Sequence, residues 1–267
     1  MTERIVTSLQ NERIKAIRAL DMRKVRRETG LYVAEGVSVL AMARHAGIAP
    51  RTLVTLAGAP ETPTARQIIS WALQERAEVL VVSEPVLAKI AAKDNPQTML
   101  AVFEQRFADA PRPDAVGPAD TWVALEEIRD PGNLGTIIRT VHAAGAAGVV
   151  LVGTCCDPYA RDSVRATMGS NFHVPLVRME KPQFMSLLAA WPGETIATDL
   201  AATHDFRAGE THRPELIVMG REGPGLSAEV VQACRRRVRI PMAGSLDSLN
   251  LAVATALMLY EIRRDRL

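Results

Sequence analysis

The sequence predicts an α/β protein of two domains, and three observations lead to this prediction. Apolar segments that look like strands alternate with segments of helical periodicity along most of the 267 residues. Residues 108–120 interrupt this alternation with three prolines, a glycine and almost no bulky apolar side chain. The composition, with 48% hydrophobic and 23% charged residues, is that of a folded globular chain. We therefore expect domains at residues 1–107 and 121–267, joined by a linker at residues 108–120.

The first domain is expected to alternate short strands and helices after a basic, helix-prone segment at residues 2–29. In that segment Ile14, Ile17 and Leu20 fall at helical spacing. The strands expected after it lie at residues 30–36, 51–56, 78–83 and 99–103, and the helices lie at residues 37–45 and 65–76 and from Glu84 onward. This order predicts a small α/β domain.

The second domain is expected to repeat the order of strand, helix and strand more regularly. Strands are expected at residues 122–128, 148–153, 174–177, 196–199 and 215–220, and helices at residues 133–144, 161–168 and 183–190 and from Ser227 onward. Because the strands are apolar throughout and alternate with helices, we expect a mostly parallel sheet covered on both faces.

The C-terminal stretch combines a strand, a polar loop and an apolar helix. Val238, Ile240 and Met242 alternate as strand residues do, and residues 251–258 are apolar on nearly every side, as in a buried helix. The polar side chains between them are Ser245, Asp247, Ser248 and Asn250. Side chains of this kind before a helix can cap it, hold a ligand, or do both, and the pattern alone does not choose.

Positive charge is unevenly distributed, although the net charge is only +2. Residues 1–30 contain eight Arg or Lys against four acids, and a second basic cluster lies at residues 235–239. Either cluster alone fits a solvated surface, but the two together favour contacts to a phosphate backbone. The candidates for RNA binding in the first cluster are Lys15, Arg23, Lys24, Arg26 and Arg27, and the second cluster comprises Arg235, Arg236, Arg237 and Arg239.

Several functional classes are not indicated. The three cysteines and five histidines have no spacing typical of a metal site, so we expect no metal. Neither a dinucleotide-binding GxGxxG after a strand nor a GxxxxGK[ST] phosphate loop occurs. Without a signal peptide or an apolar segment long enough to cross a bilayer, we expect a cytoplasmic protein without membrane contact.

Three loops deserve priority, because ligands of α/β sheets bind beyond the carboxyl ends of the strands. The first loop contains Asn133-Leu-Gly135 and leads to Arg139, which lies less than two helical turns further along, so that both could address one polar site. In the second, Gly220-Arg-Glu222-Gly-Pro-Gly225, glycines would let the backbone approach a ligand closely and Glu222 would accept hydrogen bonds. The third is the C-terminal stretch described above.

In their order and spacing the three loops resemble the three motifs of the SpoU (TrmH-type) RNA 2′-O-ribose methyltransferases of the SPOUT class. The residues that carry the resemblance are Asn133-Leu-Gly135 with Arg139, Gly220-Arg-Glu222-Gly-Pro-Gly225-Leu-Ser, and Ile240-Pro-Met with Ser248-Leu-Asn250. They cover residues 121–263. Residues 1–105 look, more loosely, like the ribosomal-protein-like substrate-binding domain attached to many of these enzymes.

The resemblance implies a fold, a cofactor and a set of site residues. It implies a deep trefoil knot in the second domain, an S-adenosylmethionine site inside the knot, and a homodimer formed around it. Gly220, Ile240, Met242 and Leu249 would line the cofactor site, and the reacting ribose would be surrounded by Asn133, Arg139, Glu222, Ser248 and Asn250. One departure is Ala252, where the family often has serine.

The resemblance also implies an activity, the transfer of a methyl group from S-adenosylmethionine to a ribose 2′-hydroxyl of RNA. We expect 23S ribosomal RNA as the substrate, with transfer RNA as the alternative substrate. The alternative from another class is a catalytically silent RNA-binding or ribosome-assembly protein of the same fold. A guanidinium is a poor base at neutral pH, so we expect Arg139 to stay charged and to stabilise the reacting oxygen.

Overall fold

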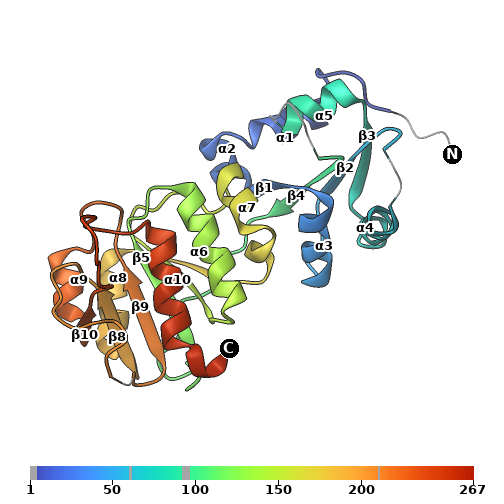
Figure 1. Ribbon diagram of the computed structural model, residues 1–267. Helices are drawn as coiled ribbons and strands as arrows, with labels where there is room; N and C mark the ends of the chain where they lie inside the picture. Colours follow the sequence, from blue (N-terminus) through green and yellow to red (C-terminus); the bar gives the residue numbers. More distant parts are fainter. Residues whose placement is uncertain (1–4, 60–61, 92–96, 210) are drawn as a thin grey trace. The chain divides into compact units, whose positions relative to one another are not determined.

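A computed structural model describes residues 5–59, 62–91, 97–209 and 211–267 and divides the chain into two compact units. The first unit comprises Met1–Gln105 together with Asp157–His173, and the second comprises Arg106–Cys156 together with Val174–Leu267. Figure 1 labels the elements of both units. The sequence predicted two continuous domains, whereas the structure assigns one internal segment of the second to the first unit. Helical periodicity shows that such a segment is helical, but not which core it packs on.

The first unit is a four-stranded sheet flanked by helices (Figure 1). Its strands follow the order β1-β4-β2-β3, in which β4 is antiparallel to both of its neighbours and β2 is parallel to β3. The elements are α1 (Glu12–Ala19), α2 (Arg23–Thr29), β1 (Leu31–Glu35), α3 (Val37–His45), β2 (Thr52–Leu56), α4 (Pro63–Gln74), β3 (Glu78–Val82), α5 (Glu84–Ala91), β4 (Met99–Glu104), α7 (Arg161–Thr167) and a 3₁₀ turn (Ser170–Phe172). The alternation expected from the sequence is confirmed, and the basic N-terminal segment forms two helices, α1 and α2.

The segment Asp157–His173 completes the core of the first unit. The Tyr159 ring lies 4.6 Å from that of Tyr32, centroid to centroid, and both side chains are buried. Asn171 donates a hydrogen bond to the hydroxyl oxygen of Tyr32 at 2.9 Å. Because these side chains come from a part of the sequence far from Met1–Gln105, the first unit depends on residues inserted between two strands of the second sheet.

A buried ion pair fixes the start of this segment. Arg26 donates to a carboxylate oxygen of Asp157 at 2.9 Å, and each side chain is only 6% exposed. The same guanidinium also donates to the carbonyl oxygens of Leu20 and Asp21. The structure therefore gives no support to the prediction that Arg26 binds RNA, because its guanidinium is buried and engaged within the first unit. Its charge is removed from solvent because a carboxylate 131 residues away in the chain pairs with it.

The second unit is a six-stranded sheet in the order β10-β8-β9-β5-β6-β7, and every pairing in it is parallel. The elements are β5 (Thr121–Glu126), α6 (Pro131–Ala143), β6 (Gly148–Val152), β7 (Leu176–Met179), α8 (Lys181–Ala190), β8 (Glu194–Thr198), β9 (Glu215–Met219), α9 (Ala228–Ala233), β10 (Arg236–Val238), α10 (Leu251–Ile262) and a 3₁₀ turn (Arg264–Arg266). The prediction of a mostly parallel sheet is confirmed. Within the described residues no helix is long and apolar enough to cross a membrane.

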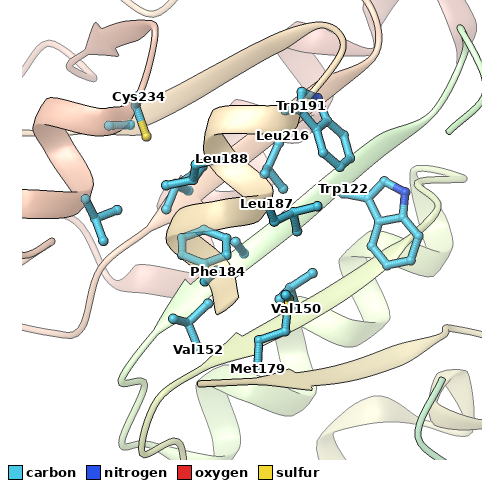
Figure 2. Packing of buried hydrophobic residues seen from close by; sticks show 14 of the residues in the cluster. Trp122, Val150, Val152, Met179, Phe184, Leu187, Leu188, Trp191, Leu216 and Cys234 are labelled. Carbon is cyan, nitrogen blue, oxygen red and sulfur yellow. The ribbon is translucent and has the colours of Figure 1, made fainter. Parts of the chain in front are cut away.

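Helices cover both faces of the second sheet. On one face Phe184, Leu187 and Leu188 of α8 pack with Val150 and Trp122 of the strands (Figure 2). On the other face α6 and α10 pack against each other. Both faces are therefore dry, which explains why the strands of this unit are apolar at nearly every position.

The last predicted strand is shorter than the sequence suggested. We expected Val238, Ile240 and Met242 to alternate along one strand, but β10 ends at Val238. Pro241 follows, and because a proline has no backbone N–H it cannot continue a hydrogen-bonded ladder. Ile240 and Met242 lie in the irregular segment that leads to α10.

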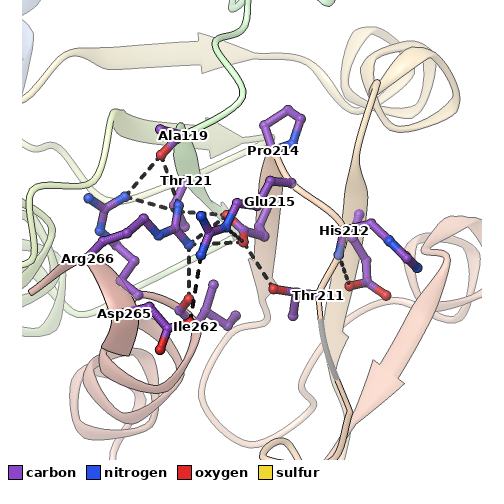
Figure 3. A network of polar contacts seen from close by, with 12 residues as sticks. Ala119, Thr121, Thr211, His212, Pro214, Glu215, Ile262, Asp265 and Arg266 are labelled. Carbon is purple, nitrogen blue, oxygen red and sulfur yellow. Dashed lines mark hydrogen bonds and ion pairs between the residues drawn. The ribbon is translucent and has the colours of Figure 1, made fainter.

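A buried carboxylate ties the end of the chain to the start of the sheet (Figure 3). Glu215, the first residue of β9, is fully buried and receives Arg266 Nη2 on both carboxylate oxygens, at 3.0 and 3.1 Å. The hydroxyl of Thr121, the first residue of β5, donates to the same carboxylate at 2.9 Å. Arg263 donates to the carbonyl oxygen of Ala144 at 2.6 Å. These contacts hold the C-terminal end of α10 beside the amino ends of β5 and β9.

The ion pair between Arg26 and Asp157 yields a prediction on stability. Replacing Asp157 by Asn leaves a buried guanidinium without its counter-charge, so the free energy of unfolding should fall by about 3 kcal/mol or more. Urea denaturation followed by circular dichroism measures this change. Glu28→Gln is the control, because it breaks the exposed pair of Lys24 with Glu28 and should change stability by less than about 1 kcal/mol. Equal stability of the two variants would contradict a structural role for the buried pair.

Candidate active site

The carboxyl ends of the parallel strands β5, β6, β8 and β9 lie at one edge of the second sheet. At this edge a cavity of about 350 Å³ is formed by the residues that follow β8 and β9 and by the segment between β10 and α10. Seven of the residues predicted from the sequence line it: Gly220, Glu222, Ile240, Met242, Ser248, Leu249 and Asn250. The structure thus brings together residues that the sequence places in two separate loops.

A chain of hydrogen bonds connects three of the predicted residues. Asn250 Nδ2 donates to Asn133 Oδ1 at 2.9 Å, and Asn133 Nδ2 donates to Glu222 Oε1 at 2.7 Å. These contacts join positions 117 and 89 residues apart in the chain. An ionised carboxylate only accepts hydrogen bonds, so Glu222 fixes which way the amide of Asn133 faces, and Asn133 in turn orients Asn250.

The two asparagines are held by the starts of two helices. Asp130 is the N-cap of α6, and its carboxylate accepts the backbone N–H of Asn133 at 2.6 Å. Asn250 is the N-cap of α10, and its Oδ1 accepts the backbone N–H groups of Ala252 and Val253. Asn250 therefore uses its oxygen to cap the helix and its nitrogen to extend the chain of hydrogen bonds. The same side chain thus caps α10 and takes part in the site.

The loop after β9 approaches itself so closely that only glycine fits at its start. A Cβ on Gly220 would lie 2.1 Å from the carbonyl carbon of Gly225 and 2.2 Å from the nitrogen of Leu226. Gly223 and Gly225 have φ values of +84° and +73°, which favour glycine. The loop therefore turns back on itself and presents backbone groups to the cavity.

The lining of the cavity is apolar in one part and polar in another. Val238, Ile240, Met242 and Leu249 supply apolar contact, and Ser248, Asn250 and Glu222 supply polar groups. This combination suits a small molecule that has a hydrophobic part and a polar or charged part.

Arg139 is not brought to this cavity by its own chain. It is exposed on α6 and is absent from the cavity lining. It lies six positions beyond Asn133 along the helix, which corresponds to about 9 Å along the axis and about 240° of rotation. The two side chains therefore leave the helix in different directions, and the expectation that both address one polar site is not met within a single chain.

Sequence reasoning missed the residues at the carboxyl end of β8. Thr198, Asp199 and Leu200 also line the cavity. The rule that ligands bind beyond the carboxyl ends of strands applies equally here, because these residues end or directly follow the strand expected at residues 196–199. Burial is the largest single influence on Asp199 and opposes its ionisation, but the hydrogen bond from Arg237 at 2.6 Å, the backbone N–H of Ala201 and the positive charge of Arg237 together outweigh burial and keep the pKa of the carboxyl below its usual value.

The second basic cluster is largely engaged within the protein. Arg235 donates to the carbonyl oxygens of Trp191 and Gly193, and Arg236 donates to that of Ala208. These contacts, with the pairing of Arg237 to Asp199, account for three guanidinium groups, whereas Arg239 is exposed and lines the cavity. The predicted role of the cluster in phosphate binding is thus not supported for its first three members.

In the first unit the remaining RNA-binding candidates lie on α1 and α2. Lys15, Arg23, Lys24 and Arg27 are exposed. Lys15 contacts Glu12 at 2.9 Å and Lys24 lies 3.8 Å from Glu28, but such exposed pairs are weak and readily exchanged. Their role stays a prediction.

The cysteine beside the site is not suited to nucleophilic chemistry. Burial, followed by the negative potential of Cys155, Asp130 and Glu222, raises the pKa of the Cys156 thiol to about 12. A thiol with such a pKa is almost entirely protonated at neutral pH, and the reactive form is the thiolate.

Comparison with protein families gives two matches that together span most of the chain. Residues 120–260 match the SpoU rRNA methylase family, and residues 11–101 match the MRM3-like substrate binding domain.

Individual relatives match over almost the full length. The chain is 28% identical to the 23S rRNA (guanosine(2553)-2′-O)-methyltransferase RlmP of Bacillus subtilis, over 97% of this chain and 98% of that protein. It is 32% identical to the 23S rRNA (uridine(2479)-2′-O)-methyltransferase of Streptomyces viridochromogenes, over 99% of this chain and 93% of that protein. Among solved structures, the AdoMet-bound rRNA methyltransferase from Sinorhizobium meliloti is similar, with a TM-score of 0.89, 42% identity, and coverage of 99% of this chain and 98% of that chain.

The close approach at Gly220 yields a prediction. In Gly220→Ala the added methyl group overlaps the backbone at Gly225, so the loop must shift and the free energy of unfolding should fall by about 1–3 kcal/mol. Hydrogen exchange of the peptide covering residues 220–227 should become faster at the same time. Gly244→Ala is the control, because open space surrounds that position and its φ is not positive. Indistinguishable exchange and stability in the two variants would show that the loop tolerates a side chain at its start.

Proposed function

We propose, because the chain belongs to the SpoU rRNA methylase family, that it transfers a methyl group from S-adenosylmethionine to a ribose 2′-hydroxyl of ribosomal RNA. The observation that carries the proposal is the contact between the three motif segments. Glu222, Asn133 and Asn250 form one chain of hydrogen bonds beside the cavity that Gly220, Ile240 and Leu249 line. A lone motif could arise by chance, but three distant segments joined by hydrogen bonds beside one cavity are an arrangement that suits this reaction.

The cavity lining fits the methyl donor in its chemistry. S-adenosylmethionine has an apolar purine face, hydrogen-bonding edges and a positively charged sulfonium that supplies the methyl group. Ile240, Met242 and Leu249 offer apolar contact, and the backbone at Gly220 can approach a ligand without steric hindrance from a side chain. We propose that these four residues hold the cofactor, which is present in the similar structure from Sinorhizobium meliloti.

The polar residues are suited to orient the acceptor ribose. Methyl transfer to oxygen is an in-line displacement, so most of the acceleration comes from alignment of donor and acceptor. Asn133, Glu222 and Asn250 are already fixed relative to one another, and Ser248 lines the same cavity. We assign them to positioning the ribose. The hydroxyl proton leaves to a phosphate oxygen or to water.

Arg139 is assigned to charge stabilisation. Its guanidinium stays protonated at neutral pH and can bind a phosphate group bidentately. Exposure on α6 leaves it accessible to RNA, and a position outside the cavity of its own chain agrees with a role at an interface.

A homodimer is part of the proposal. Val253, Leu257 and Tyr260 lie on one face of α10 and are 49%, 40% and 48% exposed, respectively. The sequence pattern of α10 is that of a helix buried all round, so a second copy of the chain would cover this exposed stripe of three side chains. Arg139 is exposed on the neighbouring α6, and a dimer through this surface would carry it toward the partner.

A trefoil knot, an RNA-binding role for the first unit and a cytoplasmic location are also part of the proposal. The segment between β10 and α10 shares its cavity with the loop after β9, and Asn250 contacts Asn133 at the start of α6. These contacts agree with a trefoil knot formed by the C-terminal part of the chain. We further propose that the first unit is the ribosomal-protein-like domain that binds RNA, and that the protein acts in the cytoplasm. The match of residues 11–101 to a substrate binding domain supports the first of these.

Two alternatives remain distinct. A transfer RNA substrate requires the same chemistry, and a catalytically silent assembly protein requires only the fold. The intact set of Asn133, Arg139, Glu222, Ser248 and Asn250 favours an active enzyme. Ribosomal RNA is favoured because the similar proteins named above act on it, one at a guanosine and the other at a uridine.

The activity can be tested directly. Purified protein mixed with S-adenosylmethionine labelled in the methyl group should label unmodified 23S ribosomal RNA at one 2′-hydroxyl. Mapping of the labelled nucleotide identifies the target, and transfer RNA in a parallel reaction should stay unlabelled. Label only in transfer RNA would favour the alternative substrate, and no incorporation into any RNA would favour the silent assembly protein.

The role of Arg139 can be tested by replacement with lysine. Lysine keeps the charge but cannot bind a phosphate bidentately, so we expect the transfer rate to fall by about a hundredfold at every pH between 6 and 9. Single-turnover methyl transfer across that pH range measures the effect. A rate close to that of the unmodified protein would exclude a requirement for the planar guanidinium.

The dimer can be tested by a charge in the exposed stripe. Leu257→Glu should convert the protein to a monomer in sedimentation equilibrium, because a buried carboxylate without a partner is costly. Leu73→Glu is the matched control, since Leu73 is 58% exposed on α4 and should leave the dimer intact. A monomeric unmodified protein would refute the proposed dimer.

A further inference from the structure

Two consecutive acids at the end of β5 contact the two ends of the loop after β9. We call residues 220–227, which connect β9 to α9, the β9 loop. Glu126 contacts Ser227 at the end of this loop, and Glu127 contacts Arg221 near its start. The β9 loop carries Glu222 and lines the cavity with Gly220, Gly223 and Gly225 among others.

Glu126 is a buried carboxylate whose hydrogen bonds go to the loop. It is 5% exposed, and its two oxygens accept the backbone N–H of Ser227 at 2.8 Å and the hydroxyl of Ser227 at 2.7 Å. Lys181 Nζ lies 3.3 Å from the same carboxylate and donates to the Ser227 hydroxyl oxygen at 2.9 Å. Ser227 is the N-cap of α9, yet its side chain makes no cap hydrogen bond; its hydroxyl donates to Glu126 and accepts from Lys181 instead.

Glu127, the next residue, contacts the β9 loop near its start. Its φ of +52° is uncommon for a residue with a side chain, and its carboxylate accepts a hydrogen bond from Arg221 Nη1 at 2.9 Å. Both side chains are about two-fifths exposed. A pair of this kind contributes little to global stability, so its effect is expected to be local.

Between its fixed ends the loop has little freedom. The backbone N–H of Gly225 donates to the carbonyl oxygen of Arg221 at 3.0 Å, and Gly220 packs directly against Gly225. A shift at either end would therefore move Glu222, which accepts the hydrogen bond from Asn133. The positions of Glu222, Asn133 and Asn250, which are linked by hydrogen bonds, therefore depend on where the β9 loop is held.

We infer that Glu126 and Glu127 are positioning residues that hold the β9 loop in the conformation needed to bind the cofactor and to orient Asn133. Neither acid touches the proposed cofactor cavity; both act through the loop. The inference rests on the proposed function, because it concerns how the same site is kept ready for its ligand.

Cofactor affinity is the measurement that tests the inference. Isothermal titration with S-adenosylmethionine should give a dissociation constant about three- to fivefold higher for Glu127→Gln, because a half-exposed ion pair is lost. For Glu126→Gln the increase should be about tenfold, since a buried carboxylate that accepts several hydrogen bonds is replaced by a group with a single acceptor oxygen. Single-turnover transfer at saturating cofactor should also slow in both variants, because Glu222 is displaced.

Matched variants separate positioning from general destabilisation. Glu229→Gln removes another carboxylate that lies 3.3 Å from Lys181 but does not hold the loop, and it should leave the dissociation constant unchanged. Glu127→Arg and Arg221→Glu should each weaken binding, and the double exchange should return the dissociation constant to within about twofold of the original if the pair acts as a unit. Melting temperatures of Glu127→Gln and Glu229→Gln should be alike.

The outcomes distinguish failure of this inference from failure of the proposed function. If the unmodified protein does not bind S-adenosylmethionine, the proposed function fails. If it binds, and the Glu127 variants bind as tightly, the inference that the two acids hold the β9 loop for cofactor binding is refuted. Failure of the double exchange to restore binding, with both single variants impaired, would also refute it, because Arg221 would then act independently of Glu127. Weaker binding by Glu127→Gln at an unchanged melting temperature supports it.

Discussion

The parallel pairing of β5 with β6 and β9 is the constraint on which the candidate site depends. In a parallel pair both strands end at the same edge of the sheet, so the residues after β5 and after β9 must meet there. Asn133 and Glu222 can form a hydrogen bond across 89 residues of sequence only for this reason. An antiparallel β9 would place its loop at the opposite edge, and the cavity would lose the loop that carries Gly220 and Glu222. The buried contacts of Glu215 at the amino ends of β5 and β9 hold the same register from the other side.

Much of the second unit was predictable from the sequence, because its signals are local. Continuous apolar runs identify buried strands, and cap residues such as Asp130 and Asn250 mark helix starts. The sequence left open whether Asn250 caps a helix or takes part in a site, and the structure shows that these roles do not compete. A side-chain amide has a distinct acceptor and donor, so Asn250 caps α10 with its oxygen and reaches Asn133 with its nitrogen. The agreement of the predicted site residues with the cavity lining follows from the same logic, since each lies just beyond a strand or just before a helix.

The features that the sequence did not predict all depend on contacts between distant residues. Arg26 looks like its basic neighbours in α2, and only the position of Asp157 shows that its charge is buried. The same holds for Arg235 and Arg236, whose guanidinium groups bind backbone carbonyl oxygens. A cluster of positive residues therefore predicts a surface for RNA only when no acceptor within the fold takes up the charges. Arg139 illustrates a different limit, because the rotation of a helix over six residues separates side chains that are close in sequence.

The acids around the cavity pose an electrostatic problem for a protein that is proposed to bind a polyanion. Four carboxylates, those of Glu126, Glu127, Asp130 and Glu222, lie at the end of β5, at the start of α6 and in the loop after β9. Three of them are compensated locally. Lys181 pairs with Glu126, Arg221 pairs with Glu127, and Asp130 caps the positive end of the α6 dipole. Glu222 receives an amide N–H from Asn133. Its charge is therefore the least compensated of the four, and under the proposed function it lies where a cationic methyl donor binds. The pairing of its neighbours thus lets the site keep one uncompensated carboxylate at the cavity without presenting a broad negative surface to RNA.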